Sequence, residues 1–163
     1  MINLLHPEEA KRLEAVYRLN ILDTPPDPEF DAITNEALIK LNVPISTITI
    51  IDKDREWFKS CQGMLTKEGP RQVAFCSHAM LADDLFIVGD TTLDDRFKDN
   101  PYVTGFPFIR FYAGIALYDS VSKLPVGVFC VKDTKPRNLS MGEVFAFMNL
   151  AERAEKLINS SKI

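Results

Sequence analysis

The sequence predicts an α+β fold in which a central antiparallel sheet carries helices on its faces. Three observations support this: two segments with helical spacing come first, apolar and β-branched strand patterns follow in pairs, and an amphipathic helix closes the chain. At 163 residues the chain has the length of one domain and can bury a full core without a disulfide or a metal. We therefore expect a single domain over residues 1–163.

Three helices are predicted from capping signals and apolar periodicity. His6-Pro7-Glu8-Glu9 begins the first, because proline and acidic residues suit the N-terminal turn, and its apolar stripe ends near Asn20. Asp27-Pro28 begins the second, with aspartate as the capping residue. Ser140-Met141-Gly142-Glu143 matches the capping box, and the apolar positions after it continue to Ile158. The last of these helices has the clearest signal.

The strands are predicted as two antiparallel pairs. Ile45 to Ile51 is a β-branched run that Arg55 to Cys61 follows as a hairpin partner, and Phe108 to Tyr118 pairs with Pro125 to Lys132.

Between these pairs lie short or irregular segments. Gln62 to Val73 is expected to be a loop over the sheet, Phe75 to Leu81 a short helix, and Phe86 to Val88 a short strand. Asp90 to Phe106 is irregular, with a helical turn around Asp94 to Lys98 and chain breaks at the proline and glycine that follow. Seventeen residues of this kind are typical of a functional or covering segment.

Charge and cysteine content limit the classes of function. The 23 acidic and 19 basic residues give a net charge of −4, which disfavours nucleic acid and anionic membranes as partners. The three cysteines form no paired metal-ligand pattern and no signal peptide precedes them, so we expect reduced thiols, no metal and a cytoplasmic location. No apolar run approaches the roughly 20 residues that cross a bilayer.

Seven sequence blocks together resemble a GAF domain of the bacterial subgroup found in sensor histidine kinases and diguanylate cyclases. In chain order they are Ile21 to Asp27 with Phe30-Asp31, Asp54 to Ser60, Phe75 to Ala79, Asp95 to Phe97, Asn100-Pro101, Arg110 to Gly114, and Gly127 to Asp133. The resemblance covers roughly residues 13 to 158. It implies a GAF-like (profilin-like) sheet of five or six antiparallel strands, the terminal helices on one face, and a ligand pocket on the other.

The resemblance also implies which residues surround that pocket. Its roof would be Phe75 to Leu81 with Asp94 to Gly105, and its floor would be Trp57, Phe58, Arg110 to Tyr112 and Phe129, from the central strands. The candidate ligand-binding residues are Trp57, Phe75, Cys76, His78, Asp95, Phe97, Arg110, Tyr112 and Phe129. The ligand is an unidentified small molecule, and any cofactor is unknown.

Several candidates have a structural interpretation beside the functional one. Cys76 and His78, two residues apart on a helix, do not face each other, so a nucleophile or metal pair is disfavoured against core packing. Trp57 and Phe58 point to opposite faces of a strand, so at most one lines a pocket. Arg110 lies in an aromatic strand and either binds an anionic ligand or pairs with a carboxylate. That carboxylate would belong to Asp90, Asp94 or Asp95.

The resemblance implies a non-catalytic sensory or regulatory domain, dimeric through its terminal helices, that acts on a kinase or cyclase effector. The chain contains no such effector and is either free-standing or a piece of a longer protein. A second interpretation is enzymatic, because some GAF-fold proteins reduce free methionine-R-sulfoxide through cysteine chemistry, and Cys61, Cys76 and Cys130 supply thiols. A third is a chromophore or haem sensor, since Cys76-Ser77-His78 superficially resembles the attachment site of bilin-binding relatives.

Overall fold

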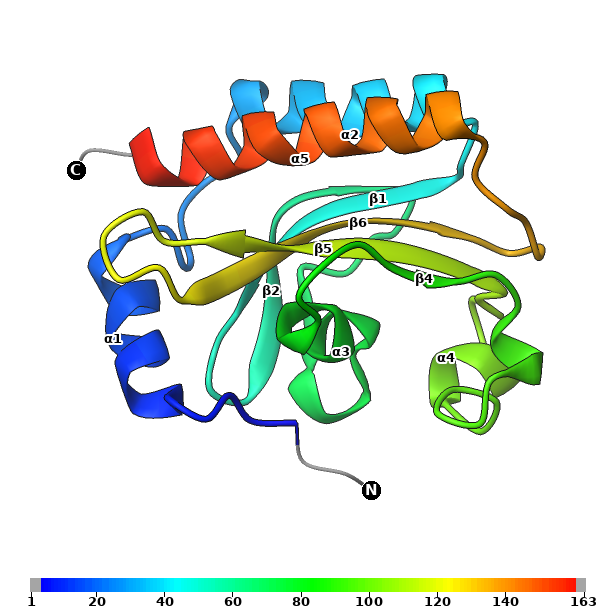
Figure 1. Cartoon of the computed structure of the whole chain (residues 1–163), viewed down its shortest axis with the longest axis horizontal. Coiled ribbons are helices and arrows are strands. Elements are labelled where there is room, and N and C mark those ends of the chain that lie inside the picture. Colours follow the sequence, from blue (N-terminus) through cyan, green and yellow to red (C-terminus); the bar gives the residue numbers. More distant parts are fainter. Residues whose placement is uncertain (1–3, 161–163) are drawn as a thin grey trace.

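The computed structural model describes residues 4–160 and shows one six-stranded antiparallel sheet with helices on both faces (Figure 1). The strands run in the order β3-β2-β1-β6-β5-β4 across the sheet. Their bounds are β1 (Ile45–Ile51), β2 (Arg55–Gln62), β3 (Glu68–Pro70), β4 (Phe86–Val88), β5 (Phe111–Tyr118) and β6 (Pro125–Asp133). This arrangement confirms the predicted α+β class.

The helices form one long layer and one set of short segments. Helices α2 (Pro28–Leu41) and α5 (Met141–Ser160) lie side by side over one face of the sheet, and α1 (Glu9–Arg18) packs at one end of it (Figure 1). Two short helices, α3 (Phe75–Leu81) and α4 (Pro101–Thr104), lie on the other side. Two 3₁₀ turns, η1 (Arg71–Val73) and η2 (Thr91–Leu93), precede them. No helix within residues 4–160 is long and apolar enough to span a membrane.

The predicted caps of the two long helices are present. Asp27 accepts a hydrogen bond from the Glu29 backbone N–H at 2.9 Å, and Pro28 occupies the first turn of α2. At α5 the Glu143 N–H donates to Ser140 Oγ at 3.1 Å, and the Ser140 N–H donates to Glu143 Oε1 at 2.8 Å. This reciprocal pair is a capping box, and it fixes where α5 begins.

The sheet separates two apolar cores. Under α2 and α5, the ring centres of Phe129 and Phe147 lie 4.9 Å apart, in a core that also holds Trp57. On the other face, Phe75 and Tyr112 belong to a second core beneath α3. Alternation of side chains along each strand produces this division, because successive residues point to opposite faces.

Two short elements differ from the sequence-based expectation. Strand β3 lies within the segment expected to be a loop, where it pairs with β2 at the sheet edge. Helix α4 begins at Pro101, which was expected to break the chain. Asn100 accepts a hydrogen bond from the Tyr102 N–H at 2.8 Å, so the proline occupies the first helical turn, where its missing N–H costs nothing. In addition, β5 begins at Phe111 rather than Phe108, whose φ of 59° is left-handed.

Candidate ligand-binding cavity

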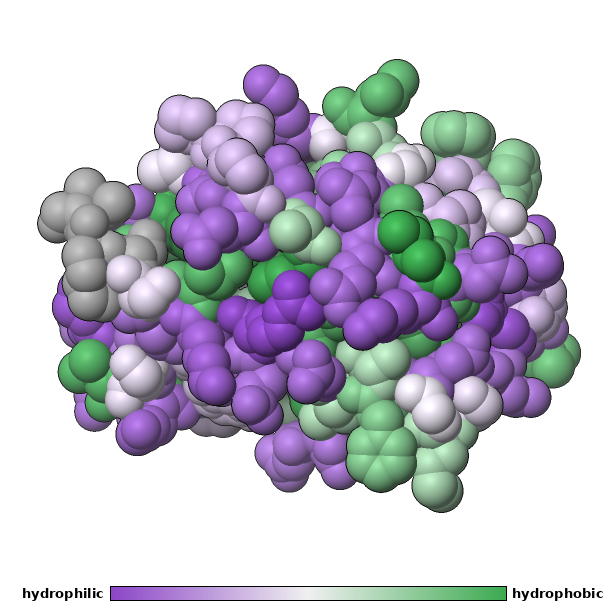
Figure 2. All heavy atoms as spheres, turned by 90° about the horizontal axis from the view of Figure 1, so that it is seen from above, coloured by the Kyte–Doolittle hydropathy of each residue, from purple (hydrophilic) through white to green (hydrophobic). Residues whose placement is uncertain are grey.

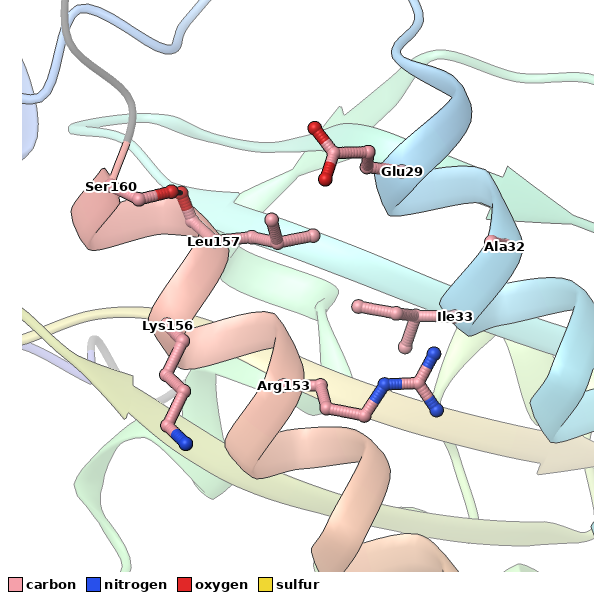
Figure 3. A pocket seen from close by; sticks show the side chains of 7 residues that line it. All are labelled: Glu29, Ala32, Ile33, Arg153, Lys156, Leu157 and Ser160. Carbon is pink, nitrogen blue, oxygen red and sulfur yellow. Dashed lines mark hydrogen bonds between the residues drawn. The ribbon is translucent and has the colours of Figure 1, made fainter.

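A shallow groove lies between the two long helices. It has a volume of about 400 Å³, and Ile33 of α2 and Leu157 of α5 point toward one another across it (Figure 3). Its charged side chains belong to the helix surface: Arg153 is 42% exposed and pairs with Glu36 at 2.9 Å, while Lys156 points away from α2. The surrounding face is mostly hydrophilic, with scattered hydrophobic patches (Figure 2). This groove therefore presents no buried polar group to a ligand.

A larger cavity of about 680 Å³ lies on the opposite face of the sheet, beside β2 and β3. Ligand pockets in proteins commonly have volumes of about 300–1,000 Å³. Its apolar lining comes from β2, from the segment after β2 and from the region of α4, namely Phe58, Met64, Leu65, Tyr102, Phe106, Pro107 and Ile109. Its polar lining includes Glu56, Cys61, Gln62, Thr66, Glu68 and Lys132.

One wall of this cavity carries a buried carboxyl group. Glu56 on β2 is 3% exposed, and its Oε1 has no hydrogen-bond partner among the described residues. Burial raises the pKa of Glu56, and the charge of Lys132 and the Cys76 thiol offset this only in part. A buried carboxyl oxygen without a hydrogen-bond partner is costly for folding, so its position at a cavity wall points to a functional role.

The second polar group is a buried lysine. Lys132 on β6 is 5% exposed, and its Nζ lies 5.9 Å from the centre of the Phe75 ring. Within residues 4–160, no hydrogen-bond or ion-pair partner is within reach of this ammonium. Burial alone would lower the pKa of Lys132, but the neighbouring Cys130 and Glu56 raise it, so the side chain is charged at neutral pH.

Beneath the cavity, thiols and hydroxyls from neighbouring strands form a buried polar cluster. Thr47 Oγ1 lies 3.0 Å from Cys130 Sγ and 2.7 Å from Thr49 Oγ1. The Tyr112 hydroxyl donates to Cys76 Sγ at 3.2 Å. The cysteines that the structure describes are free thiols, as expected from the sequence.

The three thiols differ in acidity. Burial raises the pKa of Cys76 well above its ordinary value and that of Cys61, which lines the cavity, to about 11. Burial also acts to raise the pKa of Cys130, but a hydrogen bond with Cys76 and the charge of Lys132 outweigh it and lower that pKa to about 7. The cavity-facing thiol is therefore protonated at neutral pH, whereas the most acidic thiol is fully buried.

The structure brings several predicted site residues together beneath α3, where they pack on one another. The Phe75 ring centre is 4.7 Å from that of Phe97 and 5.3 Å from that of Tyr112. His78 contacts Phe97 edge-on at 4.6 Å, and Cys76 is fully buried beside them. These side chains therefore form part of the core beneath α3.

The charged residues near this cluster pair with one another. Arg96 forms an ion pair with Asp94 at 2.7 Å, and its guanidinium lies 4.9 Å from the centre of the Phe86 ring. Burial, with a smaller contribution from Arg96, lowers the pKa of His78, so the imidazole is neutral at pH 7. Asp95 is exposed and pairs with a neighbouring lysine.

The remaining predicted site residues lie elsewhere. Arg110 Nη1 donates to the carbonyl oxygens of Val103 at 2.8 Å and Ile109 at 3.3 Å, and it forms no ion pair with Asp90, Asp94 or Asp95. Trp57 and Phe129 belong to the core under the long helices. None of the nine predicted residues is among those that line the 680 Å³ cavity.

The cavity residues that the sequence analysis missed carry a weak pattern. Val128, Cys130 and Lys132 alternate along β6 with a period of two, so the three share the face of the sheet away from the long helices. Glu56 similarly precedes Phe58 by two residues, so the two share a face of β2. A charged residue in register with buried neighbours could have marked this site.

Comparisons with known proteins agree with the architecture. No family model matches the chain. A cyclic di-GMP phosphodiesterase of Pseudomonas aeruginosa is 39% identical in an alignment of 153 residues that covers 90% of this chain. The match covers 26% of that relative, so the chain spans about a quarter of its length.

Solved structures match over nearly the whole chain. The GAF domain of an Acinetobacter phosphoenolpyruvate-protein phosphotransferase superposes with a TM-score of 0.67 at 13% identity, over 96% of this chain and 95% of that one. Free methionine-R-sulfoxide reductase from Neisseria meningitidis, solved with its substrate, superposes with a TM-score of 0.63 at 15% identity, over 99% and 96%. The sheet order, the helical layers and these superpositions show that this chain has the fold of a GAF domain.

Proposed function

We propose that this chain is a sensory and regulatory domain that binds a small molecule in the 680 Å³ cavity and does not catalyse a reaction. The observation that carries the proposal is the lining of that cavity, where Glu56 Oε1 has no hydrogen-bond partner within residues 4–160 and the buried Lys132 lies beside apolar walls. Apolar surface with a few convergent polar groups is the usual composition of a ligand site.

The partner we propose is a cytoplasmic signalling enzyme that makes or degrades cyclic di-GMP, or a histidine kinase. The 39% identity to part of a cyclic di-GMP phosphodiesterase supports the first of these. In this proposal the domain forms a homodimer through α1 and α5, and occupancy of the cavity alters the activity of the attached or associated enzyme.

Native mass spectrometry of the chain as purified, beside its denatured mass, tests ligand binding. We expect a non-covalent adduct that disappears in Lys132→Met, a change that keeps the length of the side chain but removes its charge. Lys156→Met on the surface of α5, whose side chain is 77% exposed, serves as the matched control and should retain the adduct. If the chain is empty and the small-molecule fraction of a cell extract also fails to raise its melting temperature, the proposal is wrong.

A second candidate function is reduction of free methionine-R-sulfoxide. The observation in its favour is that Cys61 lines the cavity while Cys130, with a pKa of about 7, lies in the polar cluster beneath it. The high pKa of Cys61 counts against it, because a thiol is a poor nucleophile when protonated. Thiol-dependent loss of methionine-R-sulfoxide that Cys61→Ser and Cys130→Ser both abolish would establish this activity in place of the regulatory one.

A further inference from the structure

Two buried ionisable side chains, one acidic and one basic, face one cavity without forming an ion pair. Glu56 and Lys132 are 3% and 5% exposed, and they lie on strands separated by β1. Each influences the charge state of the other, yet no direct contact joins them. Since a buried charge is stable only when another group compensates it, a ligand that carries both signs would satisfy both side chains at once.

Gly69 of β3 lies beside both Glu56 and Tyr102 at the cavity wall. A Cβ atom on Gly69 would lie 3.5 Å from Glu56 Oε2 and 3.2 Å from the Tyr102 hydroxyl oxygen. The tips of both side chains therefore converge on Gly69 of β3 at the cavity wall. A hydroxyl beside a carboxylate suits a ligand group that donates several hydrogen bonds, such as an ammonium.

The remaining walls select for an apolar portion of the ligand. Phe58, Met64 and Ile109 line the cavity, and so do Leu65 and Phe106, whose side chains are also exposed to solvent. Large exposed apolar side chains at the rim of a cavity are free to close on an apolar group that enters it. The cavity thus combines an acidic side chain, Glu56, and a basic one, Lys132, with hydrophobic walls.

Other ligand classes fit this lining less well. A neutral apolar molecule would offer no polar partner to either Glu56 or Lys132. A polyphosphate or a dinucleotide would place several negative charges beside Glu56 and Glu68, with Lys132 as the one lysine or arginine in the lining. A ligand with one positive and one negative group offers a partner to both Glu56 and Lys132.

We infer that the cavity binds a free α-amino acid with an apolar side chain. In this arrangement the ligand's ammonium hydrogen-bonds to the Glu56 carboxylate, its carboxylate hydrogen-bonds to the Lys132 ammonium, and its side chain contacts Phe58 and Ile109. The inference deepens the proposed sensory function and rests on it. In this inference, the signal that the domain detects is a free apolar amino acid.

Isothermal titration calorimetry with free amino acids, and with derivatives that lack one of the two charged groups, tests this inference. We expect one or more of L-leucine, L-isoleucine, L-valine, L-methionine and L-phenylalanine to bind the 163-residue chain. The N-acetyl derivative lacks the ammonium and the amide derivative lacks the carboxylate, and each should bind at least tenfold more weakly. The variants separate the two contacts: Glu56→Gln should weaken the amino acid but not its N-acetyl form, and Lys132→Met should weaken the amino acid but not its amide.

Matched controls and the contrary results are equally specific. Glu152→Gln and Lys156→Met remove an exposed pair on α5 and should leave the affinity unchanged. Circular dichroism and thermal melts confirm that each variant folds. Equal binding of the trimmed ligands, or failure of all five amino acids to bind, overturns the inference. A non-zwitterionic adduct in native mass spectrometry would also overturn it while leaving the sensory function intact, whereas an empty and unresponsive cavity would overturn both.

Discussion

At the scale of single residues, a buried ion network ties the N-terminal helix to the sheet. Glu9 receives hydrogen bonds from Arg12 at 3.0 Å and from Arg71 at 2.6 Å, and both arginines are buried. Arg12 Nη2 also donates to the carbonyl oxygen of Ile51 at 2.8 Å. One carboxylate therefore compensates two buried guanidinium groups, which makes it more important than a surface charge.

Glu9→Gln should lower the free energy of unfolding by about 3 kcal/mol, because it leaves two buried positive charges without a counter-charge. Urea denaturation measures this directly. Glu8→Gln is the matched control: Glu8 pairs with Lys11 at 3.6 Å, both side chains are more than half exposed, and its loss should cost less than about 1 kcal/mol. Equal stability of the two variants would show that the arginines are satisfied by carbonyl oxygens alone.

The same carboxylate should make stability sensitive to acid. Burial acts to raise the pKa of Glu9, but hydrogen bonds and charge from Arg71 and Arg12 outweigh it and lower the pKa from 4.5 to about 2. A pKa that is lower in the folded state stabilises the protein fully above pH 4.5, and this contribution is lost as the pH falls toward 2. Unfolding free energies measured across this range should fall more steeply in the native chain than in Glu9→Gln, and parallel curves would contradict the assignment.

At the scale of elements, strand β5 depends on a glycine to hold the aromatic cluster. The Tyr112 ring folds back over Gly114, two residues further along the same face of the strand. A Cβ atom on Gly114 would lie 2.2 Å from the Tyr112 hydroxyl oxygen and 2.7 Å from its Cζ. The ring and a side chain at position 114 cannot occupy this space together.

Gly114→Ala should therefore destabilise the protein by roughly 1–3 kcal/mol, as overpacking in a core does. The loss of stability caused by Gly114→Ala should be smaller when Tyr112→Leu is also present. Thermal or urea denaturation of the native chain, the two single variants and the double variant gives the interaction free energy between the two positions. Gly142→Ala in the first turn of α5 is the control, because its Cβ would meet nothing closer than 3.9 Å. It should be neutral or slightly stabilising. A neutral Gly114→Ala would mean that Tyr112 moves freely.

Elements with strong local signals were predictable from the sequence, whereas the buried charged side chains of the proposed ligand site were not. The bounds of α3 and β4 and the capping box of α5 agree with the local patterns. Helix α4 was missed because a proline can either interrupt a helix or occupy its first turn. The side-chain cap from Asn100 places Pro101 in the first turn. Glu56 and Lys132 look like solvent-facing positions of alternating strands, since local sequence does not reveal that the segment from 62 to 70 and the α4 region enclose them.

At the scale of the whole molecule, the proposed ligand site is structurally connected to the N-terminal helix. Pro70 lines the cavity, and the next residue is Arg71, which pairs with Glu9 at 2.6 Å. Arg71 also donates to the carbonyl oxygen of Asp52 at 3.1 Å in the β1–β2 turn. A ligand that shifts β3 would therefore act directly on the contact that holds α1, one of the two terminal helices assigned to the dimer.

The proposed dimer itself makes a prediction about α5. Phe145 and Met141 on this helix are 71% and 77% exposed, and Ile39 at the end of the neighbouring α2 is 80% exposed. Arg137 links the two helix ends by donating to the Leu41 carbonyl oxygen at 2.7 Å and pairing with the first turn of α5. These apolar side chains therefore share the helical face of the sheet, where burial against a second copy would remove them from water.

Sedimentation equilibrium should give the mass of a dimer for the native chain and of a monomer for Phe145→Glu, because a charge buried in an apolar interface without a partner is strongly unfavourable. Leu93→Glu is the matched control. Leu93 is 82% exposed but lies in η2, between β4 and α4 in the chain, so this change adds the same charge without affecting a long helix. A Phe145→Glu variant that keeps the mass of a dimer would exclude this part of α5 from the interface, whereas loss of the dimer in Leu93→Glu alone would place the interface on the cavity side of the sheet.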